Sequence, residues 1–65
     1  MDLRQTIRER GLKQRWIAHQ IGLSDSLFSN ILSGLAVLPD DKVGELAKLL
    51  HLTPAEVLHR LPDAP

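Results

Sequence analysis

The sequence of 65 residues contains no cysteine, no tyrosine and only two aromatic residues, Trp16 and Phe28. Without cysteine the chain forms neither disulfides nor thiolate metal sites, so its stability has to come from tight helix packing or self-association. A chain of this length makes one domain at most and buries only about 60% of its unfolded surface. With 43% hydrophobic residues and so few aromatics, we expect an aliphatic core.

Strand signals and membrane-spanning segments are also missing. No run alternates apolar and polar residues, and no Asn-Gly hairpin occurs. There is no signal peptide and no apolar run long enough to cross a membrane, which predicts a cytoplasmic protein. His19, His51 and His59 are neither paired with a nucleophile nor at metal-ligand spacing. We therefore expect no enzymatic activity, no metal site and no cofactor.

The net charge is zero, which at first argues against a nucleic-acid-binding protein. The distribution of charge is uneven, because residues 1–20 carry a net charge of +3 and residues 21–65 a net charge of −3. Such asymmetry is compatible with a basic contact face and an acidic back. The alternative is ordinary surface charge that is unevenly spread.

Residues 14–34 have the pattern of two short helices joined by a tight turn. Apolar residues recur at helical spacing on both sides of the turn: Ile17, Ala18 and Ile21 before it, and Leu27, Phe28, Ile31 and Leu32 after it. Gly22 suits the sharp reversal, Ser24 is a good N-cap for the second helix, and Gly34 is a good stop. This arrangement predicts a helix-turn-helix, whose second helix lies in the DNA major groove.

The outer face of the predicted second helix carries short hydrogen-bonding side chains. They lie at i, i+3, i+4 and i+7, with Asp25 beside them: Ser26, Ser29, Asn30 and Ser33. Ser and Asn are poorer helix formers than the Lys, Glu and Gln of an ordinary solvated face, by roughly 0.5 kcal/mol each relative to Ala. The pattern therefore favours close approach to another polar surface such as base edges. The alternative is a solvated face without a role.

The ordered set of these residues resembles the Cro and phage-repressor type of helix-turn-helix domain, that is, the lambda repressor-like XRE family. The resemblance covers about residues 3 to 61 and includes Gln14, Ile17-Ala18, Gly22, Leu23-Ser24, Phe28, Ser29, Ile31, Gly34, Pro39, Leu46-Ala47, Leu49-Leu50, Leu52-Thr53-Pro54 and Val57-Leu58. It implies an all-α, compact five-helix lambda repressor-like DNA-binding domain. We expect this domain over residues 1–61, with a frayed tail at 62–65 and helices at about 2–10, 14–21, 25–32, 40–50 and 54–60.

The resemblance also implies a set of DNA contacts. The residues expected to reach base edges are Asp25, Ser26, Ser29 and Asn30. The residues expected to contact phosphates are Arg4, Arg8, Lys13, Gln14, Arg15 and Ser33. Lys13 replaces the Ser or Thr that caps the family's second helix, which leaves backbone N–H groups open to an anion. Asp25 either accepts a hydrogen bond from a cytosine amine or repels phosphates. Because the helix at 25–32 carries no Arg or Lys, we expect only modest direct readout of the base sequence.

The loop at residues 34–39 is apolar, whereas in the family it is often polar or basic. We expect Leu38 and one of Leu35 or Val37 to fold inward and the other to remain exposed. A dimer or partner interface is expected at Leu35, Val37, Leu58 and Leu61. Trp16 either covers the edge of the core, which we favour, or anchors an interface.

Taken together, these patterns predict a bacterial or phage-encoded, nucleoid-associated regulator. We expect it to bind a pseudo-palindromic operator in double-stranded DNA as a homodimer, with helix 25–32 in the major groove, and to repress transcription. No contact with a membrane is expected. The alternative is a protein-interaction module on the same fold, such as an antitoxin-like or RNA-polymerase-binding factor, with the apolar loop 35–38 as its contact.

Overall fold

The computed structural model describes residues 2–62 and contains five α-helices in this part of the chain. They are α1 (Leu3–Glu9), α2 (Gln14–Gln20), α3 (Asp25–Leu32), α4 (Asp40–Leu50) and α5 (Pro54–Arg60). Strands are absent from residues 2–62, which confirms the all-α class. No helix within this range has the length and apolarity needed to cross a membrane. The expected frayed tail lies, from residue 63 on, outside the described residues.

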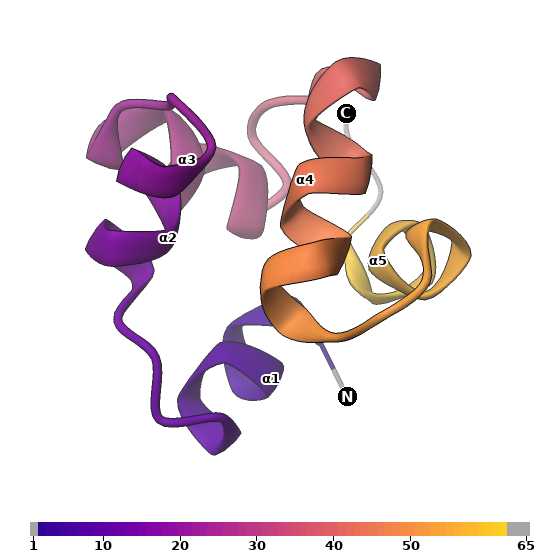
Figure 1. Cartoon of the computed structure of the whole chain (residues 1–65). Coiled ribbons are helices and arrows are strands. Elements are labelled where there is room, and N and C mark those ends of the chain that lie inside the picture. Colours follow the sequence, from indigo (N-terminus) through magenta and orange to yellow (C-terminus); the bar gives the residue numbers. More distant parts are fainter. Residues whose placement is uncertain (1, 63–65) are drawn as a thin grey trace.

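The helices form two pairs, with α2 packed on α3 and α4 packed on α5. In Figure 1 the first pair lies on the left, the second pair on the right, and α1 below and between them. This arrangement leaves the outer side of α3 uncovered by any other described helix.

Side-chain caps fix where three of the helices begin. Asp2 forms a capping box with Gln5 at α1, and Thr53 forms one with Glu56 at α5. The Ser24 hydroxyl accepts from the Leu27 N–H at 3.1 Å and caps α3. Each cap satisfies backbone N–H groups that a helix start otherwise leaves without a partner. The cap expected at Ser24 is therefore confirmed.

The core is aliphatic except for Phe28, as the composition predicts. Its buried members come from all five helices, the segment before α3 and the loop before α4: Leu3, Ile7, Ile17, Ala18, Ile21, Phe28, Ile31, Leu32, Leu38, Val43, Leu46, Ala47, Leu50 and Val57. Leu27 does not belong to this core, because 37% of it is exposed. The expectation that Leu27 lies on the inner stripe of α3 is wrong, since its neighbour Phe28 fills that side of the helix.

The apolar loop before α4 also differs in part from expectation. Leu38 is buried as predicted, but Leu35 and Val37 are 70% and 72% exposed, so neither folds inward. Ala36 is the loop residue that packs partly against the core instead. The smaller side chain takes the inward position and leaves both larger ones at the surface.

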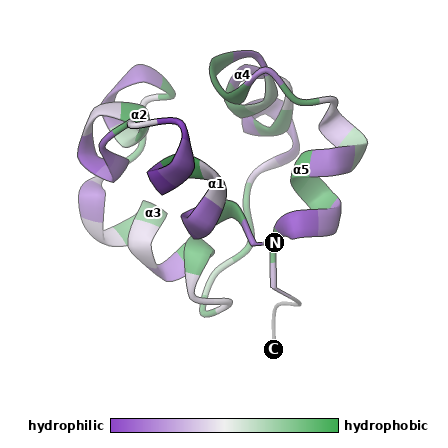
Figure 2. Ribbon diagram, turned by 90° about the horizontal axis from the view of Figure 1, so that it is seen from below, coloured by the Kyte–Doolittle hydropathy of each residue, from purple (hydrophilic) through white to green (hydrophobic). Residues whose placement is uncertain are grey.

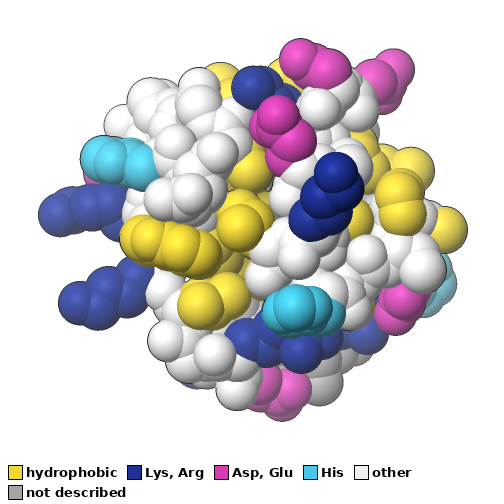
Figure 3. Space-filling view, viewed as in Figure 1, with side chains coloured by type: hydrophobic (Ala, Val, Ile, Leu, Met, Phe, Trp, Pro, Cys, Tyr) yellow, Lys and Arg dark blue, Asp and Glu magenta, His cyan; other side chains and the backbone are white. Residues whose placement is uncertain are grey.

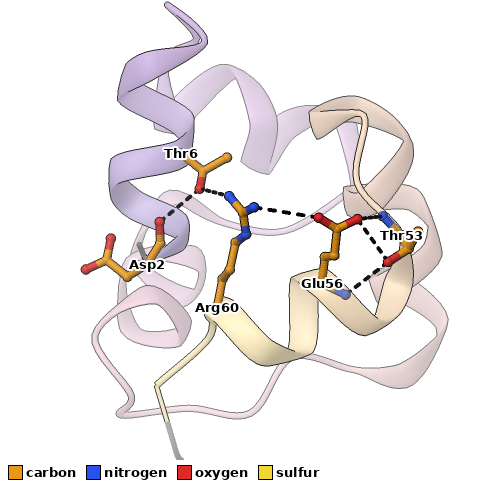
Figure 4. Close-up of polar contacts among 5 residues, drawn as sticks. All are labelled: Asp2, Thr6, Thr53, Glu56 and Arg60. Carbon is orange, nitrogen blue, oxygen red and sulfur yellow. Dashed lines mark hydrogen bonds and ion pairs between the residues drawn. The ribbon is translucent and has the colours of Figure 1, made fainter.

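A chain of polar contacts joins α1 to α5 (Figure 4). Arg60 donates to the buried Thr6 Oγ1 at 2.8 Å, and this hydroxyl donates to the Asp2 carbonyl at 3.0 Å. Arg60 also forms an ion pair with Glu56 at 3.6 Å. The one buried polar side chain of the described core, Thr6, is thus satisfied in both directions.

Candidate nucleic-acid interface

The turn between α2 and α3 orients the second helix of the pair. Gly22 adopts a left-handed conformation with φ of 75°, which other residues enter only at a cost. The Leu23 N–H then donates to the Ala18 carbonyl at 2.9 Å and closes the turn. Figure 2 shows α2 above α3, with both hydrophilic and hydrophobic residues in each helix.

Burial of one side of α3 determines which of its residues face outward. Phe28, Ile31 and Leu32 are buried, so the residues between them lie on the free side. Ser26 and Asn30 are exposed there, and Ser29 is half-buried. The polar row predicted from the sequence therefore lies at the surface.

These α3 side chains share one groove with the start of α2, which we call the α2–α3 groove. It has a volume of about 500 Å³ and is lined by Gln14, Arg15, Asp25, Ser26, Ser29 and Asn30. Six of the ten residues expected to contact DNA thus lie together. Their hydroxyl, amide and charged groups offer both donors and acceptors to a polar ligand.

The expected phosphate-contacting residues of α1 continue this surface. Arg4 and Arg8 line a neighbouring hollow together with Gln14, which therefore belongs to both. Arg4 also donates to the Ser33 hydroxyl at the end of α3, at 3.1 Å. A basic side of α1 thus lies next to the polar row of α3.

Lys13 lies at the N-cap of α2 and is exposed, but it lines neither of these two hollows. Its side chain makes no capping hydrogen bond, as expected. Of the ten residues expected to contact DNA, Lys13 is the one that the structure connects with the others only through its position next to Gln14 in the chain.

A charged contact across the turn was not predicted from the sequence. Asp25 pairs with Arg15 at 3.0 Å and lies 3.6 Å from His19 Nε2. The side chains of Arg15 and Asp25 are 79% and 46% exposed, so water screens the pair and its contribution to stability is below about 1 kcal/mol. Arg15 precedes Asp25 by ten positions, a separation at which no local spacing rule applies, and only the α2–α3 packing brings them together.

The residues expected to form a dimer or partner interface are only partly brought together. Val37 and Leu58 line one hollow, and Leu35 lies in the same loop as Val37. We call Leu35, Val37 and Leu58 the loop patch. Leu61 lines that hollow too but packs partly against the core, so it offers less surface than expected.

Trp16 is 45% exposed and lines one hollow together with Leu12 and Leu49, which pack partly against the core. Its two interpretations, cover for the edge of the core and anchor of an interface, both stay predictions. Within residues 2–62, no three His, Cys, Asp or Glu residues are grouped so that they could hold a metal ion.

The model of a protein family described as a helix-turn-helix domain matches residues 2–59 of the chain. No curated protein and no solved structure matches it significantly. The matched range includes α1 to α4 and most of α5, and it confirms the helix-turn-helix resemblance drawn from Gln14 to Gly34.

Proposed function

Because the chain belongs to the helix-turn-helix domain family, we propose that it is a transcriptional regulator, a repressor, that binds a specific operator as a homodimer. A helix-turn-helix is a DNA-binding unit whose second helix enters the major groove. Here that helix is α3. A regulator of this kind would act at the DNA of the nucleoid.

The observation that carries this proposal is the composition of the α2–α3 groove. The exposed amide of Asn30 is suited to a bidentate contact with adenine, and Ser26 can bond to several bases. Arg4, Arg8 and Arg15 supply positive charge on the same side for phosphates. Figure 3 shows Lys and Arg side chains projecting beside α2, on the left of the molecule.

Two copies of α3, related by a two-fold axis, would read half-sites about 34 Å apart. Such a dimer needs an apolar contact, and the exposed loop patch supplies one. Repression then follows from occupation of a promoter by the dimer.

The experiment begins with selection of bound sequences from random double-stranded DNA. The selected operator is then titrated with the protein and with a Ser26→Ala/Asn30→Ala variant. We expect the variant to lose the preference for the operator, since each good base contact contributes about 1–3 kcal/mol of discrimination. Gln20→Ala removes an exposed amide of α2 outside the groove and is the matched control.

The salt dependence of binding tests the electrostatic part separately. With about six or more phosphate contacts, operator affinity should fall roughly 1,000-fold or more between 50 and 200 mM salt. Selection without enrichment, or an affinity that does not change with salt, would contradict DNA binding through this face.

A second candidate function is supported by the exposure of Leu35 and Val37, at 70% and 72%. On a regulator they form the dimer contact, whereas on an antitoxin-like or RNA-polymerase-binding factor they would contact a protein partner. The two functions differ in their response to Ser26→Ala/Asn30→Ala. That variant should lose operator binding under the first function and retain partner capture, in the presence of competitor DNA, under the second.

A further inference from the structure

A separate apolar hollow, which we call the Trp16 hollow, lies where α2 and the segment before it face the end of α4. It has a volume of about 540 Å³ and is lined by Arg10, Leu12, Trp16, Lys48, Leu49 and His51. None of these residues lines the α2–α3 groove or belongs to the loop patch. In Figure 3 a group of hydrophobic side chains is visible between α2 and α4.

The floor of the Trp16 hollow is apolar and held in place. Leu12 and Leu49 are partly buried and pack against the core, while Trp16 is 45% exposed above them. Tryptophan is enriched among the residues that contribute most to protein–protein binding, because it offers a large rigid area with little entropy loss. An exposed tryptophan beside two anchored leucines is therefore suited to receive an apolar side chain.

The rim of the hollow is cationic. Arg10 and Lys48 line it together with His51, and no Asp or Glu does. Neither Arg10 nor Lys48 makes an ion pair within residues 2–62, whereas Lys42 on the same helix as Lys48 pairs with Glu45 at 3.7 Å. Carboxylates of a partner would meet two cations that form no salt bridge with an acid of the described residues, although the charge of Arg10 also acts on Glu56 of α5.

The same charges disfavour a second copy of the chain as the occupant. A two-fold contact places each surface against itself, which would bring Arg10 and Lys48 near their own copies. The loop patch carries no such penalty, because Leu35, Val37 and Leu58 are uncharged. A two-fold dimer therefore uses the loop patch and leaves the Trp16 hollow open.

We propose that the Trp16 hollow docks an acidic amphipathic helix of a second protein. One or two leucine-like side chains of that helix contact Trp16, Leu12 and Leu49, and its flanking carboxylates pair with Arg10 and Lys48. This is the helix-in-groove mode of recognition, with apolar anchors one helical turn apart. This proposal does not depend on the proposed DNA binding, because the Trp16 hollow and the α2–α3 groove have no residue in common.

The test uses Trp16 itself, because it is the only tryptophan of the chain. The full chain is titrated with a 14-residue helical peptide, of our own design, that carries leucine on one face and glutamate on the other and has no aromatic residue. The expected result is a saturable shift of Trp16 emission to shorter wavelength as water leaves the indole. A peptide with lysine in place of glutamate should cause no saturable shift.

Variants locate the binding. With a dye-labelled glutamate peptide, Trp16→Ala should abolish the rise in anisotropy, and Arg10→Glu/Lys48→Glu should weaken binding by about tenfold or more. Leu35→Ser, which alters the loop patch, should bind as the unaltered chain does. Circular dichroism is the check that each variant is folded, and Arg10 and Lys48 are exposed enough for substitution.

Four results would overturn the proposal. They are the absence of a saturable emission change, equal binding of the lysine peptide, equal binding of a single-stranded thymidine oligonucleotide, and an emission shift that depends on protein concentration without any peptide. The last result would show that copies of the chain associate through the Trp16 hollow.

Discussion

Asp25 is the one acidic side chain among the residues that line the α2–α3 groove. It lies in the first turn of α3, where the helix dipole favours a carboxylate. Its ion pair with Arg15 at 3.0 Å keeps that guanidinium beside α3 rather than extended toward a phosphate. On the proposed DNA-binding face, Asp25 would therefore compete with a phosphate for Arg15 and would itself repel the DNA backbone.

We therefore predict that Asp25→Asn raises affinity for DNA of arbitrary sequence by about 3- to 10-fold at low salt. It should also steepen the salt dependence by about one phosphate contact, as Arg15 becomes available. Electrophoretic mobility shifts with a non-operator duplex at several salt concentrations measure both quantities. Asp41→Asn, which removes the same charge from the exposed first turn of α4, is the control. An equal gain in both variants would mean that Asp25 acts through net charge alone.

Among the helices, α5 shows how one side chain serves both a cap and a tertiary contact. The Glu56 carboxylate accepts from the Thr53 N–H and from the Thr53 hydroxyl, both at 3.2 Å. It also pairs with Arg60, which holds α5 to Thr6 of α1. The backbone hydrogen bond from Thr53 and then its side-chain hydrogen bond lower the pKa of Glu56 below its ordinary value of 4.5, and the charges of Arg60 and Arg10 add to this.

A lowered pKa means that the folded state favours the ionised Glu56 more than the unfolded state does. Its contribution to stability is therefore complete well above pH 4.5 and is lost as the pH falls through the lowered pKa. We predict that Glu56→Gln lowers the free energy of unfolding near neutral pH, and that its difference from the unaltered chain shrinks in acid. Urea unfolding at a series of pH values measures this. Glu45→Gln, which alters an exposed acid of α4 with no capping role, should change the pH profile less. Identical profiles for both variants would contradict the role given to the cap.

For the molecule as a whole, the all-α fold could be predicted because its rules are local. Apolar spacing and the cap at Ser24 depend on neighbours within one or two turns, and they are present in the structure. The polar row of α3 could be predicted for the same reason, since burial of Phe28 determines the outward side of that helix.

The features that could not be predicted depend on how the helices are oriented relative to one another, and no local rule predicts this orientation. The contact of Arg60 with Thr6 spans 54 positions, and the exposure of Leu35 and Val37 depends on which loop residue fits the core. His51 ends α4 in a left-handed conformation with φ of 56°, a position where the sequence offers no glycine as a signal. The Trp16 hollow likewise exists only after the segment between α1 and α2, α2 itself and the end of α4 have come together.

The proposed homodimer would also depend on this packing, because the position of the dimer contact would determine whether two α3 helices can reach one operator. Val37 and Leu58 are 72% and 57% exposed and line one hollow, so a two-fold contact there buries apolar area that water otherwise covers. We predict that the 7.3 kDa chain sediments at twice its mass, and that Val37→Ser/Leu58→Ser returns it to the single mass while circular dichroism shows a folded chain. Operator affinity should fall by at least about tenfold in that variant, because each monomer then binds one half-site alone.

Trp16→Ser makes the same kind of change at the separate hollow and should leave the dimer intact. If Trp16→Ser dissociated the dimer and Val37→Ser/Leu58→Ser did not, the dimer contact would lie at the Trp16 hollow and not at the loop patch. The two α3 helices would then be related by a different two-fold axis.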